Sequence, residues 1–222
     1  MKRFAIYFAP PVNAPLTRLA SAWLGRSAEE TPRGAIPEDI WRETVADPRA
    51  YGFHATLKPP FRLQPGTDET ELFARARDFA AGRRPFAAPP LRVASLSSFL
   101  ALTLSDFCPE FEALAADCVR EFDRFRLPPS EEELARRRRA KLSPKQLEYL
   151  GQWGYPYVME EWRFHMTLTS SLAPPLFTEI CTHLTGLFDA HCREPFRVDS
   201  MCLFEQAGPG ELFEIAARFP FA

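Results

Sequence analysis

The stretch Tyr51-Gly52-Phe53-His54-Ala55-Thr56-Leu57-Lys58 returns later in the chain as Trp162-Arg163-Phe164-His165-Met166-Thr167-Leu168-Thr169. Both copies follow one pattern: an aromatic residue, any residue, Phe, His, any residue, Thr and Leu. The chain holds only four histidines, so chance is a poor explanation for a second Phe-His-x-Thr-Leu, and we interpret it as an internal repeat. Two histidines in matched settings indicate one shared site.

Each copy alternates apolar and polar residues, which is the pattern of a strand with one buried face. The apolar set of the first copy, Phe53, Ala55 and Leu57, is expected to anchor the strand in the core. The opposite face offers one histidine, at least one hydroxyl and one cation in each copy, and the second copy adds Thr169. The candidate site residues are His54, Thr56, Lys58, His165, Thr167 and Arg163.

The order strand, helix, histidine strand, helix, strand occurs twice, once from Arg3 and once from Phe99. The sequence around Arg92 to Leu96 also echoes that around Arg197 to Met201. We therefore predict an α+β fold, bilobal and duplicated, with two pseudo-symmetric sheets, outer helices and a central cleft. The single domain over residues 1–222 would have a first-motif lobe at about 1–97, a second-motif lobe at about 98–222 and a helical insertion at about 128–156.

Three segments carry more specific expectations. Residues 3–9 alternate as a strand in which Tyr7 lies opposite the apolar face, so Tyr7 is a candidate substrate-binding residue in the cleft. Residues 34–50 are rich in Pro, Gly and charge and are expected to form a loop with a short helix. In the insertion, Ser130 begins a capping box with Glu133. The arginines from Arg136 to Arg139 are expected mainly in solvent, and the alternative is a phosphate-binding lid over the cleft.

Composition restricts the class of protein. The 222 residues are 46% hydrophobic with a formal net charge of -2, which argues against nucleic acid or an anionic membrane as a partner. Five cysteines without Cys-x-x-Cys spacing, and no signal peptide at the N-terminus, indicate a reduced, cytoplasmic protein. No apolar run approaches the 18 or more residues of a membrane span. No feature of the sequence specifies an oligomeric state.

The paired motifs are suited to proton transfer at a phosphate. An imidazole titrates near pH 6.5, so one histidine can act as base while the other, protonated, acts as acid. For a cyclic phosphodiester, one would deprotonate an attacking water and the other would protonate the leaving alkoxide. The phosphate oxygens would be bound by the threonines and the nearby cations, namely Thr56, Thr167, Lys58 and Arg163. This scheme requires no metal and no cofactor. His183 and His191 lack a repeat partner, and we interpret both as non-catalytic.

The motifs His54-Ala55-Thr56-Leu57 and His165-Met166-Thr167-Leu168 resemble those of the two-histidine (2H) phosphoesterase superfamily, which carries two His-x-Thr/Ser-x motifs on facing lobes. The sequence at 51–58, with Gly154-Tyr155-Pro156-Tyr157-Val158 before the second motif, is similar to sequences of a bacterial branch of the superfamily. This branch is often encoded among carbon-phosphorus lyase genes. The resemblance implies a hydrolase of the cyclic phosphodiesterase type that takes a small phosphorylated substrate in phosphonate metabolism, with a cyclic ribose phosphate as candidate.

Other functions stay open at this point. Members of the superfamily act on 2',3'-cyclic nucleotides, on the cyclic phosphate of ADP-ribose or on RNA ends. The alternatives are therefore a module that binds a nucleotide or phosphosugar without turnover, and an RNA-end processing enzyme. Neither the assignment of acid and base to His54 and His165 nor the substrate follows from the sequence.

Overall fold

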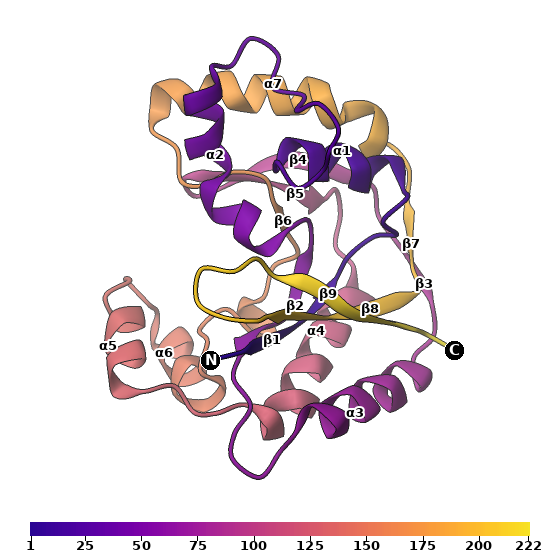
Figure 1. Cartoon of the computed structure of the whole chain (residues 1–222), viewed down its shortest axis with the longest axis vertical. Helices are drawn as coiled ribbons and strands as arrows, with labels where there is room; N and C mark the ends of the chain where they lie inside the picture. The colour runs from indigo at the N-terminus through magenta and orange to yellow at the C-terminus, as the bar shows by residue number, and fades with distance from the viewer.

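The computed structural model describes residues 1–222 and has the predicted α+β architecture (Figure 1). The strands are β1 (Arg3–Phe8), β2 (Ala55–Phe61), β3 (Phe86–Ala88), β4 (Leu91–Leu96), β5 (Phe99–Leu104), β6 (Met166–Thr167), β7 (Phe196–Val198), β8 (Ser200–Gln206) and β9 (Glu214–Pro220). The α-helices are α1 (Pro15–Trp23), α2 (Glu38–Tyr51), α3 (Glu69–Ala81), α4 (Pro109–Phe122), α5 (Glu131–Arg138), α6 (Pro144–Trp153) and α7 (Pro174–Cys192). Two short 3-10 helices, η1 (Asp123–Phe125) and η2 (Met159–Glu161), complete the chain.

Seven strands form one antiparallel sheet in the order β4-β5-β6-β2-β1-β8-β9. The two histidine motifs therefore lie on the neighbouring central strands β2 and β6, and the two predicted sheets are continuous with each other. The predicted lobe boundary near residue 97 is wrong as a division of this sheet. Strands β8 and β9 pair beside β1, whereas β4 pairs with β5 beside β6. The chain crosses between the halves through the two-stranded ladder of β3 and β7.

The pairing of β2 with β6 relates the two copies of the motif by a local two-fold axis. Ala55 pairs with Met166, and these two residues occupy the same position in the two copies of the motif. The local two-fold axis of an antiparallel pair passes between such partners, so it relates His54 to His165 and Thr56 to Thr167. The sequence repeat is thus also a structural repeat about the centre of the sheet.

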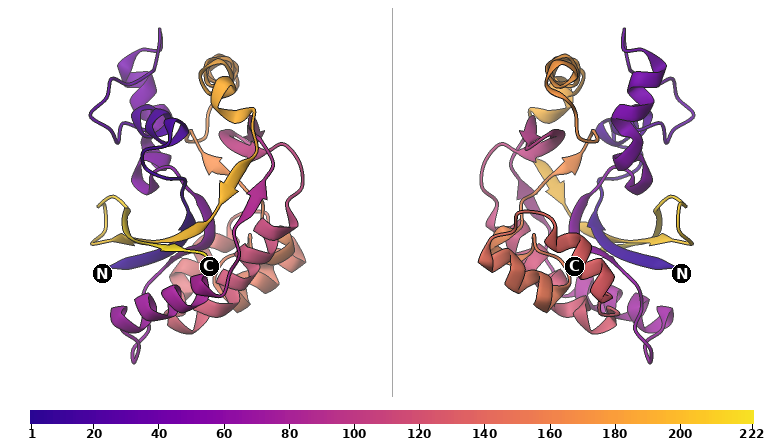
Figure 2. Two further views of the ribbon diagram at one scale, coloured as in Figure 1. Left: turned by 90° about the vertical axis from the view of Figure 1, so that its right-hand side faces the viewer. Right: turned by 90° about the vertical axis from the view of Figure 1, so that its left-hand side faces the viewer.

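Helix α4 packs on the motif strand β2, and other helices pack on the outer strands of the sheet. Contacts are extensive between α4 and β2, between α7 and β4, and between α3 and the strands β8 and β9. The views in Figure 2 show α3 and α4 at one end of the molecule and α1, α2 and α7 at the other. A cluster of 41 buried residues forms the main core. It includes Phe53, Ala55 and Leu57, which confirms the predicted buried face of the first motif.

The prediction of a mainly loop segment at 34–50 is wrong, because Glu38–Tyr51 forms the 14-residue helix α2. Its buried residues Trp41, Thr44, Val45 and Pro48 follow helical spacing. Pro48 cannot donate a hydrogen bond to the carbonyl of Thr44. That carbonyl instead accepts the backbone N–H of Ser170 at 2.6 Å. A contact remote in sequence therefore compensates the proline and ties α2 to the segment that follows the second histidine motif.

The helical insertion is present as α5 and α6, which lie together at one side of the molecule (Figure 1). Ser130 and Glu133 form the predicted capping box at the start of α5. None of the helices combines the length and the apolar composition that crossing a membrane would require.

Candidate active site

His54 is held by its own chain and by an aromatic wall. Its Nδ1 lies 2.9 Å from the carbonyl oxygen of Gly52 and its Nε2 lies 3.2 Å from Oγ1 of Thr56. A carbonyl only accepts, so Nδ1 carries the proton of the neutral ring, and Thr56 can donate to the free Nε2. The ring of Tyr7 stacks on the imidazole with centroids 3.7 Å apart. The ring centroid of Phe204 lies 6.0 Å from that of the imidazole.

His165 repeats the first half of this arrangement. Its Nδ1 lies 2.8 Å from the carbonyl oxygen of Arg163, two residues earlier, as Gly52 is two residues before His54. The neutral ring therefore carries no proton on Nε2 in either motif; this atom contacts Thr56 in His54 and has no hydrogen-bond partner in His165. The residues that pack against the two imidazoles differ. Thr167 pairs with Ala101 in the sheet, whereas Thr56 pairs with Tyr7. His165 has Phe99 at 6.0 Å and no stacked tyrosine.

The environment lowers the pKa of both imidazoles. Burial lowers the pKa of His54 to about 4; the Gly52 carbonyl opposes this shift, and the neighbouring His165 adds to it. Burial also lowers the pKa of His165 below its usual value, against the effect of the Arg163 carbonyl. Both rings are therefore mainly neutral at pH 7. The more strongly shifted ring, His54, is the one better suited to act as a base.

The register brings the four motif side chains together. Continuing the Ala55–Met166 pair by one residue in each direction places His54 opposite Thr167 and Thr56 opposite His165. The two histidines are then diagonal neighbours on one face, with their strand positions about 7–8 Å apart. Their side chains can therefore approach one phosphoryl group from two sides, where an attacking oxygen and a leaving oxygen would lie.

The DUF1045 family, described as a protein of unknown function, matches residues 56–214, which is most of the chain and includes both motif threonines. The chain belongs to the DUF1045 family.

Two curated relatives of this DUF1045 protein carry the name ribose 1,5-bisphosphate phosphokinase PhnN. The protein from Janthinobacterium sp. (strain Marseille) is 38% identical over 100% of this chain and 51% of its own length. The protein from Laribacter hongkongensis (strain HLHK9) is 33% identical over 96% of this chain and 50% of its own length. The chain thus spans about half the length of the curated relatives it matches.

Solved structures with a similar arrangement of elements are more remote. The crystal structure of E. coli LigT complexed with NADP+ is 12% identical, with a TM-score of 0.47 over 99% of this chain and 98% of LigT. The crystal structure of TT0787 of Thermus thermophilus is 14% identical, with a TM-score of 0.47 over 99% of this chain and 97% of TT0787.

The prediction that Lys58 binds phosphate beside His54 is wrong for this DUF1045 protein. Lys58 is only 1% exposed, and its Nζ donates to the carbonyl of Val119 and to Oδ1 of Asp123, both at 3.1 Å. The cause is an irregularity in β2, where Tyr7 pairs with Thr56 but Ile6 pairs with Lys58. The extra residue is a β-bulge. It reverses the alternation, so Leu57 and Lys58 both face the helices.

Arg163 and Tyr7 also differ from their predicted roles. The guanidinium of Arg163 donates to the carbonyls of Glu160 and Trp162. Strand β6 begins only at Met166, so the alternation rule does not extend back to Arg163. Its backbone carbonyl, which orients His165, is the part that reaches the site. Tyr7 is 1% exposed, so it supports the ring of His54 and presents little surface to a ligand.

Two residues that shape the His54 site were not predicted from the sequence. Gly52 has φ of +77° and supplies the carbonyl that orients His54. A Cβ there would lie 3.1 Å from Nη1 of Arg26, so glycine satisfies both the backbone angle and the space. Phe213, outside the strands, lies beside Tyr7 at 6.3 Å and stacks on Tyr51 at 5.3 Å. The Gly before Phe53 in the first motif was the one available signal.

Replacing Tyr7 with alanine is expected to raise the pKa of His54 from about 4 toward its usual value, because water would reach the exposed face of the ring. Tyr7→Phe keeps the stacked ring and should leave this pKa near its original value. The measurement is an NMR titration of the His54 imidazole in both variants, with His165 as internal reference. An equal pKa in Tyr7→Ala and Tyr7→Phe would contradict a desolvating role for Tyr7.

Proposed function

We propose that this protein is a phosphoesterase that opens a small cyclic phosphodiester, with His54 and His165 as its acid-base pair. The observation that carries the proposal is the two-fold arrangement of the motifs. Each imidazole is oriented through Nδ1 by a carbonyl two residues earlier, so Nε2 of both rings is the nitrogen that exchanges a proton with the substrate. The resemblance of the motifs to the 2H phosphoesterase superfamily supports the same reaction.

In the proposed mechanism, Nε2 of neutral His54 accepts a proton from the attacking water. The water oxygen forms a bond to phosphorus, and the bond from phosphorus to the leaving ring oxygen breaks. Protonated His165 gives its proton to that oxygen, which becomes a hydroxyl. On binding of the substrate, the hydroxyl of Thr56 turns from Nε2 of His54 to donate to one non-bridging oxygen, and Thr167 donates to the other. Charge and atoms balance without a metal ion.

The substrate we favour is a ribose cyclic phosphate. If the diester joins O1 and O2 of ribose 5-phosphate, cleavage of the bond between phosphorus and O2 yields ribose 1,5-bisphosphate. That product is the substrate in the name of the curated relatives, which are about twice as long as this chain. The chain has no Gly-x-x-x-x-Gly-Lys-Ser/Thr sequence for a nucleoside triphosphate. We therefore propose that the kinase reaction belongs to the remainder of those relatives, and that both steps serve phosphonate metabolism.

The test is turnover in EDTA. The purified chain is incubated with ribose 5-phosphate 1,2-cyclic phosphate and, in parallel, with 2',3'-cyclic AMP, and the phosphorus is followed by 31P NMR. We expect the cyclic diester signal to be replaced by that of a phosphomonoester. With water labelled with 18O, one label should enter the new monoester. Binding of both compounds without conversion would contradict a phosphoesterase and favour a binding module.

A further inference from the structure

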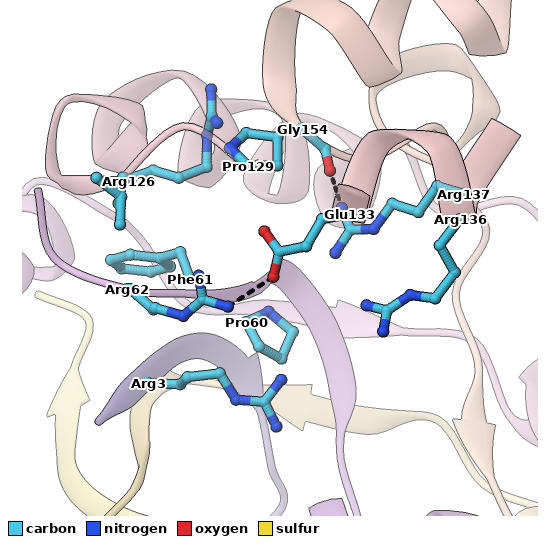
Figure 3. Close-up of a pocket in the computed structure, with 11 residues that line it drawn as sticks. Arg3, Pro60, Phe61, Arg62, Arg126, Pro129, Glu133, Arg136, Arg137 and Gly154 are labelled. Atoms are coloured by element: carbon cyan, nitrogen blue, oxygen red, sulfur yellow. Dashed lines mark hydrogen bonds and ion pairs between the residues drawn. The ribbon is translucent and has the colours of Figure 1, made fainter. Parts of the chain in front are cut away.

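A pocket outside the histidine pair has five arginines among its eleven lining residues. Its volume is about 70 Å³, which is room for about five water-sized atoms, or one phosphate group. The charged residues that line it come from β1, from the end of β2, from the segment after η1 and from α5. They are Arg3, Arg62, Arg126, Arg136, Arg137 and Glu133. In Figure 3 the side chains of Arg3, Arg62 and Arg136 extend toward the same space from three different elements.

The pocket carries more positive charge than its neighbours neutralise. Arg62 pairs with Glu133 at 2.6 Å, and Arg126 pairs with Asp123 at 2.7 Å. The other three arginines have no carboxylate partner. Arg3 donates to the side-chain oxygen of Gln206, Arg137 donates to the carbonyl of Gly154, and the guanidinium of Arg136 bonds to no other side chain or carbonyl.

Unpaired guanidinium groups around one hollow repel one another. Burial lowers the pKa of Arg137; Tyr155 and Glu133 oppose this shift, and the neighbouring Arg136 and Arg126 add to it. An arginine nevertheless stays protonated in proteins. An anion in the pocket would relieve this repulsion. The planar fork of a guanidinium matches the oxygens of a phosphate, and several forks that converge favour a phosphomonoester with its two negative charges.

The arginine pocket and the histidine pair lie on the same face of the sheet. Arg3 and Tyr7 are on β1 at even spacing, and both contact Phe213, at 5.3 Å from the guanidinium and 6.3 Å from the tyrosine ring. Tyr7 in turn stacks on His54. Four residues of strand span about 13 Å. A strand distance of this order separates the two sites, and the buried ring of Phe213 contacts the residues at both ends.

We propose that the arginine pocket is a second phosphate site, which binds a terminal phosphomonoester of the substrate whose cyclic diester lies between His54 and His165. This inference rests on the proposed function for the identity of the second group, but the pocket itself is a binding site for phosphate. The substrate class is thereby narrowed to small sugars with two phosphoryl groups, one cyclic and one terminal. Glu133 is the residue with which an entering phosphate competes for Arg62.

The decisive variants are Arg136→Gln and its matched control Arg139→Gln. Both remove one positive charge from the same end of α5, and Arg139 does not line the pocket. Affinity for inorganic phosphate and for ribose 5-phosphate is measured by calorimetry. We expect Arg136→Gln to weaken both about tenfold, as for the loss of one hydrogen bond to a charged group, and Arg139→Gln to change them less than about twofold. Equal weakening in the two variants would overturn the proposal.

Turnover supplies a second, separate readout. The ratio of kcat/KM for the ribose cyclic phosphate with and without its 5-phosphate should fall about tenfold in Arg136→Gln and stay constant in Arg139→Gln. Binding that depends on Arg136 without any turnover would reject the phosphoesterase and retain the pocket. Turnover with an unchanged ratio would retain the phosphoesterase and reject the pocket. A preference for an oligonucleotide ending in a cyclic phosphate over the phosphosugar would also reject the proposed substrate class.

Discussion

Replacing either motif histidine with alanine is expected to lower kcat/KM for the cyclic phosphodiester by about 10²–10⁴-fold, the range that a general acid or base contributes. The two histidines act in one step, at either end of the same phosphoryl group. The double variant should therefore lose little more than the worse single variant, because effects within one catalytic unit are not additive. The measurement is steady-state hydrolysis of the ribose cyclic phosphate in EDTA.

The pH dependence separates the two roles. Burial lowers the pKa of His54 to about 4 and that of His165 below its usual 6.5. If His54 is the base and His165 the acid, kcat/KM rises as His54 loses its proton and falls as His165 loses its own. The maximum should therefore lie below pH 6.5, and the residual activity of His54→Ala should lack the rising limb.

The control for these variants is His191→Ala, since His191 is exposed on α7 away from the motifs. Its kcat/KM should stay within a factor of about two, and all variants should unfold at a similar temperature. Full activity in His54→Ala or His165→Ala would reject the proposed mechanism.

The local part of the fold could be predicted from the sequence because it depends on residues close together. The alternation from Phe53 to Leu57 and from Phe164 to Leu168 predicted which residues face the core, and Ser130 with Glu133 predicted the start of α5. Each of these features is decided by a period of two residues or by a single turn. The two-fold relation of the motifs was likewise predictable from their repetition.

The rest depends on contacts between distant segments. A helix with Pro48 in its last turn is acceptable because the N–H of Ser170 reaches the carbonyl of Thr44. The order of the sheet follows from pairing between strands of opposite halves, which the strands themselves do not specify. The arginine pocket draws Arg3, Arg62 and Arg136 from three segments, and only the run that begins at Arg136 is conspicuous in the sequence.

The bulge in β2 is the most consequential of these features, because one extra residue moved Lys58 from the candidate site into the core. The buried charge of Lys58 depends on its partner Asp123 for stability. Asp123→Ala is expected to lower the free energy of unfolding by about 3–5 kcal/mol, the cost of leaving a buried charge without its partner. Asp123 accepts from Lys58 at 3.1 Å and from Arg126 at 2.7 and 3.1 Å, so its loss affects two cations at once. Urea unfolding at pH 7 measures the change.

Two further variants show whether burial of the charge is the cause. Asp117→Ala, on α4, removes a carboxylate that pairs at the surface with Arg83 and should cost about 1 kcal/mol or less. Lys58→Met fills a similar volume while Asp123 keeps Arg126, so it should cost less than about 1.5 kcal/mol.

Burial lowers the pKa of Lys58 from 10.5 to about 8, so between these values the unfolded chain binds more protons than the folded one. The Lys58 contribution to stability therefore rises with pH across that window. The stability of Lys58→Met should lack this rise. If Lys58→Met and the unsubstituted protein show the same pH dependence of stability, Lys58 is not a buried cation.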